Sequence, residues 1–352
     1  MTDVLSVPSH RRNRLAEIAA KLRAAQNVVL VTHVNADGDG TGSEVAVAAW
    51  LEREGKTVHI VNPTPFPPQF THLLGNPDWV RDPSDTRVAD TIAGADVVLI
   101  LDTSEPKRVG RLATLVAGRP IAVIDHHVPP DIGFDGLVLE DSTACATGEL
   151  VYDLLTVAEA DRPWGMTIIE GIYTAIVMDT GSFRFSNSTR RAHAIAGDMI
   201  EQGVDPEAVY RRLFAMVPLR RIQLLRHGLD QLRTDDELPI TWITVRREIM
   251  NELDATADDV EGLIEHARSI EGTEVAILFR ETSDGSTKVS LRSSGDVDVN
   301  AIARRLGGGG HVKAAGTLMG DRLEVAQEKV LNAVREAIRA LPAGYRSANP
   351  AD

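Results

Sequence analysis

The chain has 352 residues, 43% of them hydrophobic and 25% charged, an ordinary composition for a globular protein of about two domains. Its net charge of −14 disfavours long duplex nucleic acid as a partner, because such binding depends on Lys and Arg side chains that neutralise phosphates. A small nucleotide held by a few local cations is compatible with this charge.

The sequence lacks signals for a membrane or for secretion. No apolar run approaches the length of a transmembrane helix, and residues 1–22 have no apolar core followed by a cleavage site. The single cysteine, Cys145, excludes an intramolecular disulfide. We therefore expect a cytoplasmic protein with no membrane partner.

The first half of the chain alternates strand and helix patterns. Buried strands are predicted at the apolar runs NVVLVT, TVHIVN, DVVLILD and PIAVID, with helical or loop segments between them. This alternation predicts an α/β fold, with a parallel sheet that has helices on both faces. From about Ser142 the pattern becomes helical.

Strand patterns resume further along the chain. They occur at ITWITV, EVAILFRE and STKVSLRSS, and helix patterns follow at VNAIARRL and EVAQEKVLNAVREAIRAL. The second domain is therefore predicted to be smaller and of the α+β class. We expect a first domain over residues 1–189, a helical linker over 190–236, a second domain over 237–342 and a flexible tail over 343–352.

Potential metal ligands follow three of the four strands predicted in the first half. His33 follows the first strand, Asp102 ends the third, and the run from Asp125 to His127 ends the fourth. Because the carboxyl ends of parallel strands meet at one edge of a sheet, we expect these side chains to converge. A single aspartate at such a position is more often a helix cap or a turn residue. The repeated set of His and Asp residues favours a metal site.

The stretch THVNADGDGTGS places Asp37 and Asp39 on a glycine-rich loop between a strand and a helix, and Asp179 ends a later apolar helix. Such loops often bind phosphate through backbone N–H groups, but two carboxylates would repel a phosphate. A dinucleotide-binding G-x-G-x-x-G turn is also disfavoured, because Ser43 occupies the third glycine position.

Carboxylate and imidazole ligands without thiolates suit a divalent cation such as manganese (Mn²⁺) or Mg²⁺. Imidazole favours Mn²⁺ over Mg²⁺. The number of carboxylates predicts two divalent cations, which together activate a water and stabilise a phosphoryl oxygen.

Five segments together resemble a known family. The segments THVNADGDGTGS, LDTSEPKRVG, IDHHVP and MDTGSFRFSN resemble the four motifs of the DHH phosphoesterase superfamily. VSLRSSGDVDVNAIARRLGGGGHVKAAG resembles the C-terminal substrate domain associated with it, so the resemblance covers nearly the whole chain. The layout is similar to that of bacterial nano-RNases. This implies hydrolysis of short oligoribonucleotides, 3′-phosphoadenosine 5′-phosphate (pAp), or linear or cyclic di-adenosine nucleotides such as pApA.

The resemblance also implies a role for each matching residue. The implied metal ligands are His33 and Asp37 for one ion, Asp39, His126 and Asp179 for the other, and Asp102 between them. His127 would face the scissile phosphate, and Asp125 would orient a histidine. Arg108 would contact a phosphate beside the ions. Residues 1–189 would then be the catalytic domain, and residues 237–342 the substrate-binding domain.

Four consecutive glycines, Gly307 to Gly310, precede His311. A flexible loop or a tight turn would explain them, but successive glycine N–H groups can also bind an anion. The nearby cationic residues favour an anion site, and the resemblance implies that this element holds the nucleotide. The substrate-binding candidates are Arg292, Ser293, Gly309, Gly310 and His311, with Asn300 as a further one.

The leading hypothesis is a two-metal phosphodiesterase or phosphatase that acts on short RNA or a small nucleotide. A manganese-dependent inorganic pyrophosphatase would share the catalytic half, although pyrophosphate needs no nucleotide-binding domain. A nucleotide sensor without turnover is the other alternative, and the complete acidic set disfavours it. The family resemblance further implies a homodimer.

Overall fold

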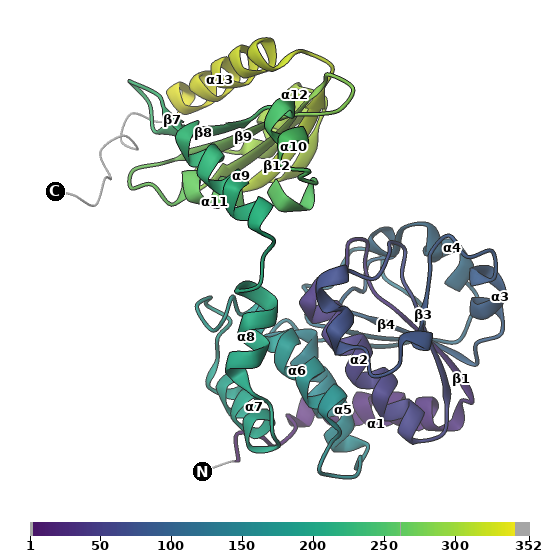
Figure 1. Cartoon of the computed structure of the whole chain (residues 1–352). Helices are drawn as coiled ribbons and strands as arrows, with labels where there is room; N and C mark the ends of the chain where they lie inside the picture. The colour runs from purple at the N-terminus through teal and green to yellow at the C-terminus, as the bar shows by residue number, and fades with distance from the viewer. Residues whose placement is uncertain (1–2, 261, 342–352) are drawn as a thin grey trace. The chain divides into compact units, whose positions relative to one another are not determined.

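The computed structural model describes residues 3–260 and 262–341. The chain forms two compact units, Met1–Met216 and Val217–Asp352 (Figure 1). The boundary lies inside the segment predicted as a linker. Of its helices, α7 (Arg190–Glu201) and α8 (Pro206–Phe214) belong to the first unit and α9 (Leu219–Asp230) to the second. The predicted tail, residues 343–352, lies outside the described residues.

A six-stranded sheet in the order β3-β2-β1-β4-β5-β6 forms the centre of the first unit. Its strands are β1 (Asn27–Val31), β2 (Thr57–Val61), β3 (Val80–Arg81), β4 (Val97–Leu101), β5 (Ile121–Asp125) and β6 (Leu137–Glu140). Every neighbouring pair is parallel, which confirms the predicted sheet. The strand order reverses between β1 and β4, and ligands of such sheets usually bind at the carboxyl ends of the strands at this point.

Helices cover both faces of this sheet, as predicted (Figure 1). They are α1 (Ser9–Ala24), α2 (Gly38–Arg53), α3 (Val88–Ala93), α4 (Ala113–Val116), α5 (Thr147–Val157) and α6 (Met166–Asp179), with the 3₁₀ helices η1 (Pro68–Leu73), η2 (Pro77–Trp79) and η3 (Pro106–Leu112). Strand residues such as Leu30 and Leu99 share one apolar core with α1, α2, α5 and α6. The intervening residues, such as Val29 and Val98, share a second core with α3 and α4.

Close packing of α2 against α6 depends on two facing glycines. A Cβ atom built on Gly171 of α6 would lie 2.6 Å from the carbonyl oxygen of Gly42 in α2. Glycine is therefore required for this approach. The approach brings Asp179, at the end of α6, to the same side of the sheet as Asp37 and Asp39 at the start of α2.

The second unit contains a six-stranded sheet in the order β11-β12-β10-β9-β8-β7. Its strands are β7 (Arg233–Thr234), β8 (Ile240–Val245), β9 (Val275–Glu281), β10 (Thr287–Ser293), β11 (Gly309–His311) and β12 (Ala314–Met319). The β8–β9 pair is parallel and the other pairs are antiparallel. Helices α12 (Val299–Arg305) and α13 (Leu323–Ala340) share one core with the sheet. Helices α9, α10 (Arg247–Glu252) and α11 (Leu263–Arg268), with η4 (Asp258–Val260), share another, which confirms the predicted α+β class.

The glycine run GGGGHVKAAG is part of this sheet rather than a free loop. It forms β11 and the beginning of β12. A side chain on Gly308 would collide with the backbone of Gly316, so glycine is needed where the two segments cross. Among the described residues of the whole chain, no helix is both long and apolar enough to cross a membrane.

Candidate metal centre

The predicted ligands of the first unit lie at the carboxyl ends of neighbouring strands. His33 follows β1, Asp102 follows β4 directly, and Asp125 and His126 lie at the end of β5. Asp37 is the N-cap of α2, where its side chain accepts hydrogen bonds from the N–H groups of the first turn. These side chains therefore lie together at the edge of the sheet where the strand order reverses, as expected for a ligand site in this fold.

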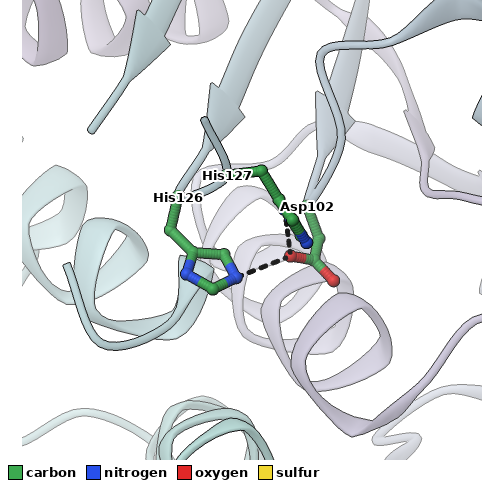
Figure 2. Close-up of side chains that lie close together, drawn as sticks. All are labelled: Asp102, His126 and His127. Carbon is green, nitrogen blue, oxygen red and sulfur yellow. Dashed lines mark ion pairs between the residues drawn. The ribbon is translucent and has the colours of Figure 1, made fainter. Parts of the chain in front are cut away.

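Asp102 lies close to three histidines, and Figure 2 shows its carboxylate beside His126 and His127. Its Oδ2 atom is 3.3 Å from His33 Nε2, and its Oδ1 atom is 3.5 Å from His126 Nε2 and 3.7 Å from His127 Nδ1. Oδ2 thus faces His33, whereas Oδ1 faces His126 and His127. The φ angle of Asp102 is +62°, a left-handed conformation that is uncommon for a residue other than glycine.

The remaining acidic residues complete two groups around these histidines. His33 Nε2 lies 3.7 Å from Asp37 Oδ2. His126 Nε2 lies 3.6 Å from Asp39 Oδ2 and 3.7 Å from Asp179 Oδ2. Potential ligand atoms of His33, Asp37 and Asp102 form one compact group, and those of Asp39, His126 and Asp179 form another. The structure thus brings together all six residues that the sequence predicted as metal ligands.

The electrostatics of these groups favour cations. Burial raises the pKa of Asp39, and the neighbouring carboxylates of Asp102 and Asp179 raise it further. Nδ1 of His33 donates to the carbonyl oxygen of Val34 at 2.9 Å, so Nε2 is the ring nitrogen that faces the carboxylates and could bind a cation. Nε2 of His33 and of His126 are both buried without a hydrogen-bond partner among the described residues. Divalent cations would satisfy these lone pairs and the carboxylates together, so the residues fit such a pair of ions.

Asp125 lies beside this group and holds His127. Burial favours the protonated acid, but the side-chain and backbone hydrogen bonds from His127 outweigh it and lower the pKa of Asp125 to about 2. Asp125 Oδ1 accepts from Nδ1 of His127 at 2.8 Å, which raises the pKa of that histidine. The other ring nitrogen, Nε2, lies 3.2 Å from a guanidinium nitrogen of Arg108. The histidine that Asp125 orients is therefore His127.

The sequence did not reveal several polar contacts behind the ligands. The Thr147 hydroxyl donates to Asp102 Oδ1 at 3.0 Å, and the N–H groups of Thr147 and Gly148 donate to Asp39 at 2.7 and 2.9 Å. Asn187 Nδ2 donates to Asp179 Oδ2 at 3.1 Å. Asn187 lies in the fourth motif and could have been noted there, whereas Thr147 looked like an ordinary first residue of a helix.

A buried glutamate also lies near this centre. The Glu44 side chain in α2 is completely buried, and its Oε2 atom accepts a hydrogen bond of 2.9 Å from Asn62 Nδ2. Asn62 in turn accepts at 3.0 Å from the backbone N–H of Thr32, next to His33. Burial raises the pKa of Glu44 to about 8, so this acid is largely protonated at neutral pH.

In the second unit, two of the substrate-binding candidates share one face of the sheet. Arg292 of β10 and His311 of β11 both pair with Ala314 of β12, so they belong to one cross-strand row. The Ser293 side chain is buried on the opposite face, and its hydroxyl donates to the Gly295 carbonyl oxygen at 3.1 Å. The structure therefore does not bring the Ser293 hydroxyl together with Arg292.

The other candidates lie beside this row or on the neighbouring helix. Gly309 and Gly310 precede His311 in β11, and Asn300 lies in α12. Arg292 also lines a cavity of about 420 Å³ together with Arg280 and Lys288, which no sequence motif indicates. Apolar side chains of α11 and β9 complete its wall. Cationic side chains beside an apolar wall suit a ligand that has both a phosphate group and a nucleobase.

Comparisons with known proteins agree with this architecture. The model of the DHH family, N-terminal domain, matches residues 27–177, and that of the DHHA1 domain matches residues 242–340. The chain is 34% identical over 330 residues to the bifunctional oligoribonuclease and PAP phosphatase NrnA of Thermus thermophilus, covering 93% of this chain and 95% of the relative. It is 26% identical over 308 residues to the Bacillus subtilis protein of the same name, covering 85% of this chain and 91% of the relative.

A solved structure shares the fold over nearly the full length. The exopolyphosphatase-related protein from Bacteroides fragilis superposes with a TM-score of 0.84 at 24% identity, covering 92% of this chain and 96% of that one. The family models, the relatives and the arrangement of strand ends agree. This chain belongs to the DHH family of phosphoesterases and carries a DHHA1 domain in its C-terminal half.

Proposed function

We propose that this chain is a two-metal phosphoesterase that hydrolyses short oligoribonucleotides and pAp. The observation that carries the proposal is the placement of Asp102, whose two carboxylate oxygens lie 3.3 and 3.5 Å from histidines of two separate groups. A carboxylate between two cations is typical of sites that transfer phosphoryl groups. The names of the relatives, oligoribonuclease and PAP phosphatase, support this substrate class.

The first unit would hold the two cations. The proposed ligands are His33 and Asp37 for one ion, Asp39, His126 and Asp179 for the other, and Asp102 for both. When bound, such ions would lower the pKa of a water and stabilise negative charge on the phosphoryl oxygens. Mn²⁺ is the proposed metal, because two imidazole ligands favour it over Mg²⁺ in an otherwise carboxylate site.

His127 is the proposed proton donor to the leaving oxygen. The hydrogen bond to Asp125 fixes the ring and raises the pKa of His127, which favours the protonated ring that a proton donor requires. The His127 side chain is 41% exposed, which leaves the ring accessible to a substrate. Arg108, beside Nε2 of His127, is the proposed contact to the phosphate.

The second unit would bind the nucleotide. Arg292 and His311 are the proposed contacting side chains, and the backbone of Gly309 and Gly310 lies next to His311. The cationic cavity that includes Arg292 supports an anionic ligand. The buried Ser293 hydroxyl donates to the Gly295 carbonyl oxygen on the opposite face, so Ser293 is not among the proposed contacts. We further propose a cytoplasmic homodimer, as the family resemblance and the composition suggest.

A substrate panel tests this function. Metal-free protein is supplied with Mn²⁺ or Mg²⁺ and incubated with pApA, pAp, a short oligoribonucleotide, cyclic di-AMP or pyrophosphate. We expect nucleotide release from the first three and the highest kcat/KM with Mn²⁺. Asp102→Ala should lose metal and activity together, whereas Asp90→Ala, an exposed change in α3, should keep both.

Three outcomes would contradict the proposal. Hydrolysis of pyrophosphate alone would assign a pyrophosphatase. Tight binding of pApA without turnover would assign a sensor. Mn²⁺-dependent hydrolysis retained in Asp102→Ala would exclude this metal centre as the site of reaction.

A further inference from the structure

The first turn of α5 contacts two of the proposed metal ligands directly. Ala146, the N-cap residue of this helix, provides no side-chain cap. Instead, the N–H groups of Thr147 and Gly148 donate to the two oxygens of Asp39. Asp39 belongs to α2, so a proposed metal ligand caps a different helix. This contact places the buried first turn of α5 against the metal centre.

The Thr147 side chain extends this contact to the second ligand. Thr147 is completely buried, and its hydroxyl donates to Asp102 Oδ1 at 3.0 Å. Oδ1 is the oxygen that faces His126, whereas Oδ2 faces His33. One hydrogen bond to Oδ1 therefore fixes the rotation of the carboxylate and still leaves a second lone pair on that oxygen.

A buried ion network holds this turn in place. Glu149, two residues further along α5, accepts from the Cys145 N–H at 3.1 Å through Oε2. Its Oε1 atom pairs with Arg11 at 2.7 Å and with Arg191 at 3.2 Å. Since Arg11 and Glu149 are both buried, the position of Thr147 is set by the fold and not by a bound cation.

We propose that Thr147 is a positioning residue of the metal centre. Its hydroxyl aligns the Asp102 carboxylate so that one oxygen serves each group of ligands before any ion binds. The proposal rests on the two-metal site described under the proposed function. Partners that orient a metal ligand typically change metal affinity by about 10- to 100-fold when they are removed, and Thr147 should act on this scale.

Calorimetric titration of metal-free protein with Mn²⁺, in the absence of substrate, tests the role. Thr147→Val keeps the shape but removes the hydroxyl, and we expect it to bind Mn²⁺ at least about 10-fold more weakly. Thr147→Ser keeps the hydroxyl and should restore most of the affinity. Thr174→Val is the matched control, because Thr174 is equally buried in α6 and its hydroxyl has no partner among the described residues. This control should bind Mn²⁺ like the native protein.

Each failure has a separate meaning. Native affinity in Thr147→Val would overturn the inference, even if the native protein hydrolyses pApA. Equal weakening in Thr147→Ser, or in Thr174→Val, would assign the effect to packing and would also overturn it. If the native protein and the variants behave as expected with Mn²⁺ but no nucleotide is hydrolysed, the proposed function fails while the role of Thr147 stands.

Discussion

Replacing Glu44 with glutamine should stabilise the metal-free protein at neutral and alkaline pH and have little effect below about pH 5. Glu44 is completely buried, and its Oε1 atom has no hydrogen-bond partner among the described residues. Burial, only partly offset by the hydrogen bond from Asn62, raises the pKa of Glu44 to about 8. Glutamine has the same shape and stays neutral, so it imitates the protonated acid at every pH.

The size of the effect follows from the two pKa values. The folded protein holds the Glu44 proton with a pKa of about 8, against 4.5 for an ordinary glutamate. Because the folded pKa is the higher one, the stabilising contribution is complete below about pH 4.5 and is lost as the pH rises toward 8. At about 1.4 kcal/mol per pH unit, the loss is roughly 3 kcal/mol at pH 7 and approaches roughly 5 kcal/mol above pH 8.

Urea unfolding in the presence of a chelator measures this dependence. The free energy of unfolding is compared for the native protein, Glu44→Gln and Glu17→Gln from about pH 5 to about pH 8. Glu17 lies on the surface of α1, with 55% of its side chain exposed, and controls for the loss of one negative charge. The advantage of Glu44→Gln over the native protein should grow with pH, while Glu17→Gln follows the native curve. Parallel curves for the native protein and Glu44→Gln would refute the burial argument.

Three further predictions concern packing and binding. Arg11→Met should lower the free energy of unfolding by about 3–5 kcal/mol, because it leaves three buried carboxylates without their shared cation; a loss below about 1 kcal/mol would contradict this. Gly171→Ala should cost about 1–3 kcal/mol in the same assay because of the close Gly42 carbonyl. A Cβ atom added at Gly197 in α7 would meet no atom of the described residues within 4 Å, so Gly197→Ala should instead stabilise by up to about 1 kcal/mol. Equal effects of the two changes would contradict the packing argument. His311→Ala should raise KM for pApA with little change in kcat, and a loss confined to kcat would contradict a binding role.

The sequence was sufficient to predict the sheet and the edge at which the site forms. Each apolar run of the first half is short enough to be a strand, and the residues that follow β1, β4 and β5 are ones that bind metals. The rule that parallel strands expose their carboxyl ends on one edge then brings His33, Asp102 and His126 together without coordinates. The short strands β3 and β6 were not predicted, because two to four residues at a sheet edge leave little periodic pattern.

The hydrogen bonds that orient the proposed metal ligands could not be predicted from the sequence as the sheet edge could. Thr147 lies 108 residues from Asp39 in sequence, and its contacts depend on how the first turn of α5 packs against α2. No spacing rule connects them, because each threonine or N–H group has many possible acceptors in a folded chain. The strand formed by the glycine run was likewise not predictable from the sequence. Its composition suggested a loop or an anion site, but its place in β11 depends on the approach of β12.

In the metal centre, repulsion between neighbouring carboxylates is opposed by the hydrogen bonds that hold these carboxylates in place. The fold holds Asp39, Asp102 and Asp179 close together, and burial, together with their mutual repulsion, raises the pKa of Asp39 and of Asp179. Hydrogen bonds from the first turn of α5 fix Asp39 and Asp102 in spite of this repulsion. Divalent cations bound between these carboxylates would remove the repulsion, so the folded chain should bind them more tightly than the unfolded chain does. Metal binding should therefore stabilise the first unit by mass action, and protonation of the carboxylates at acidic pH should weaken it.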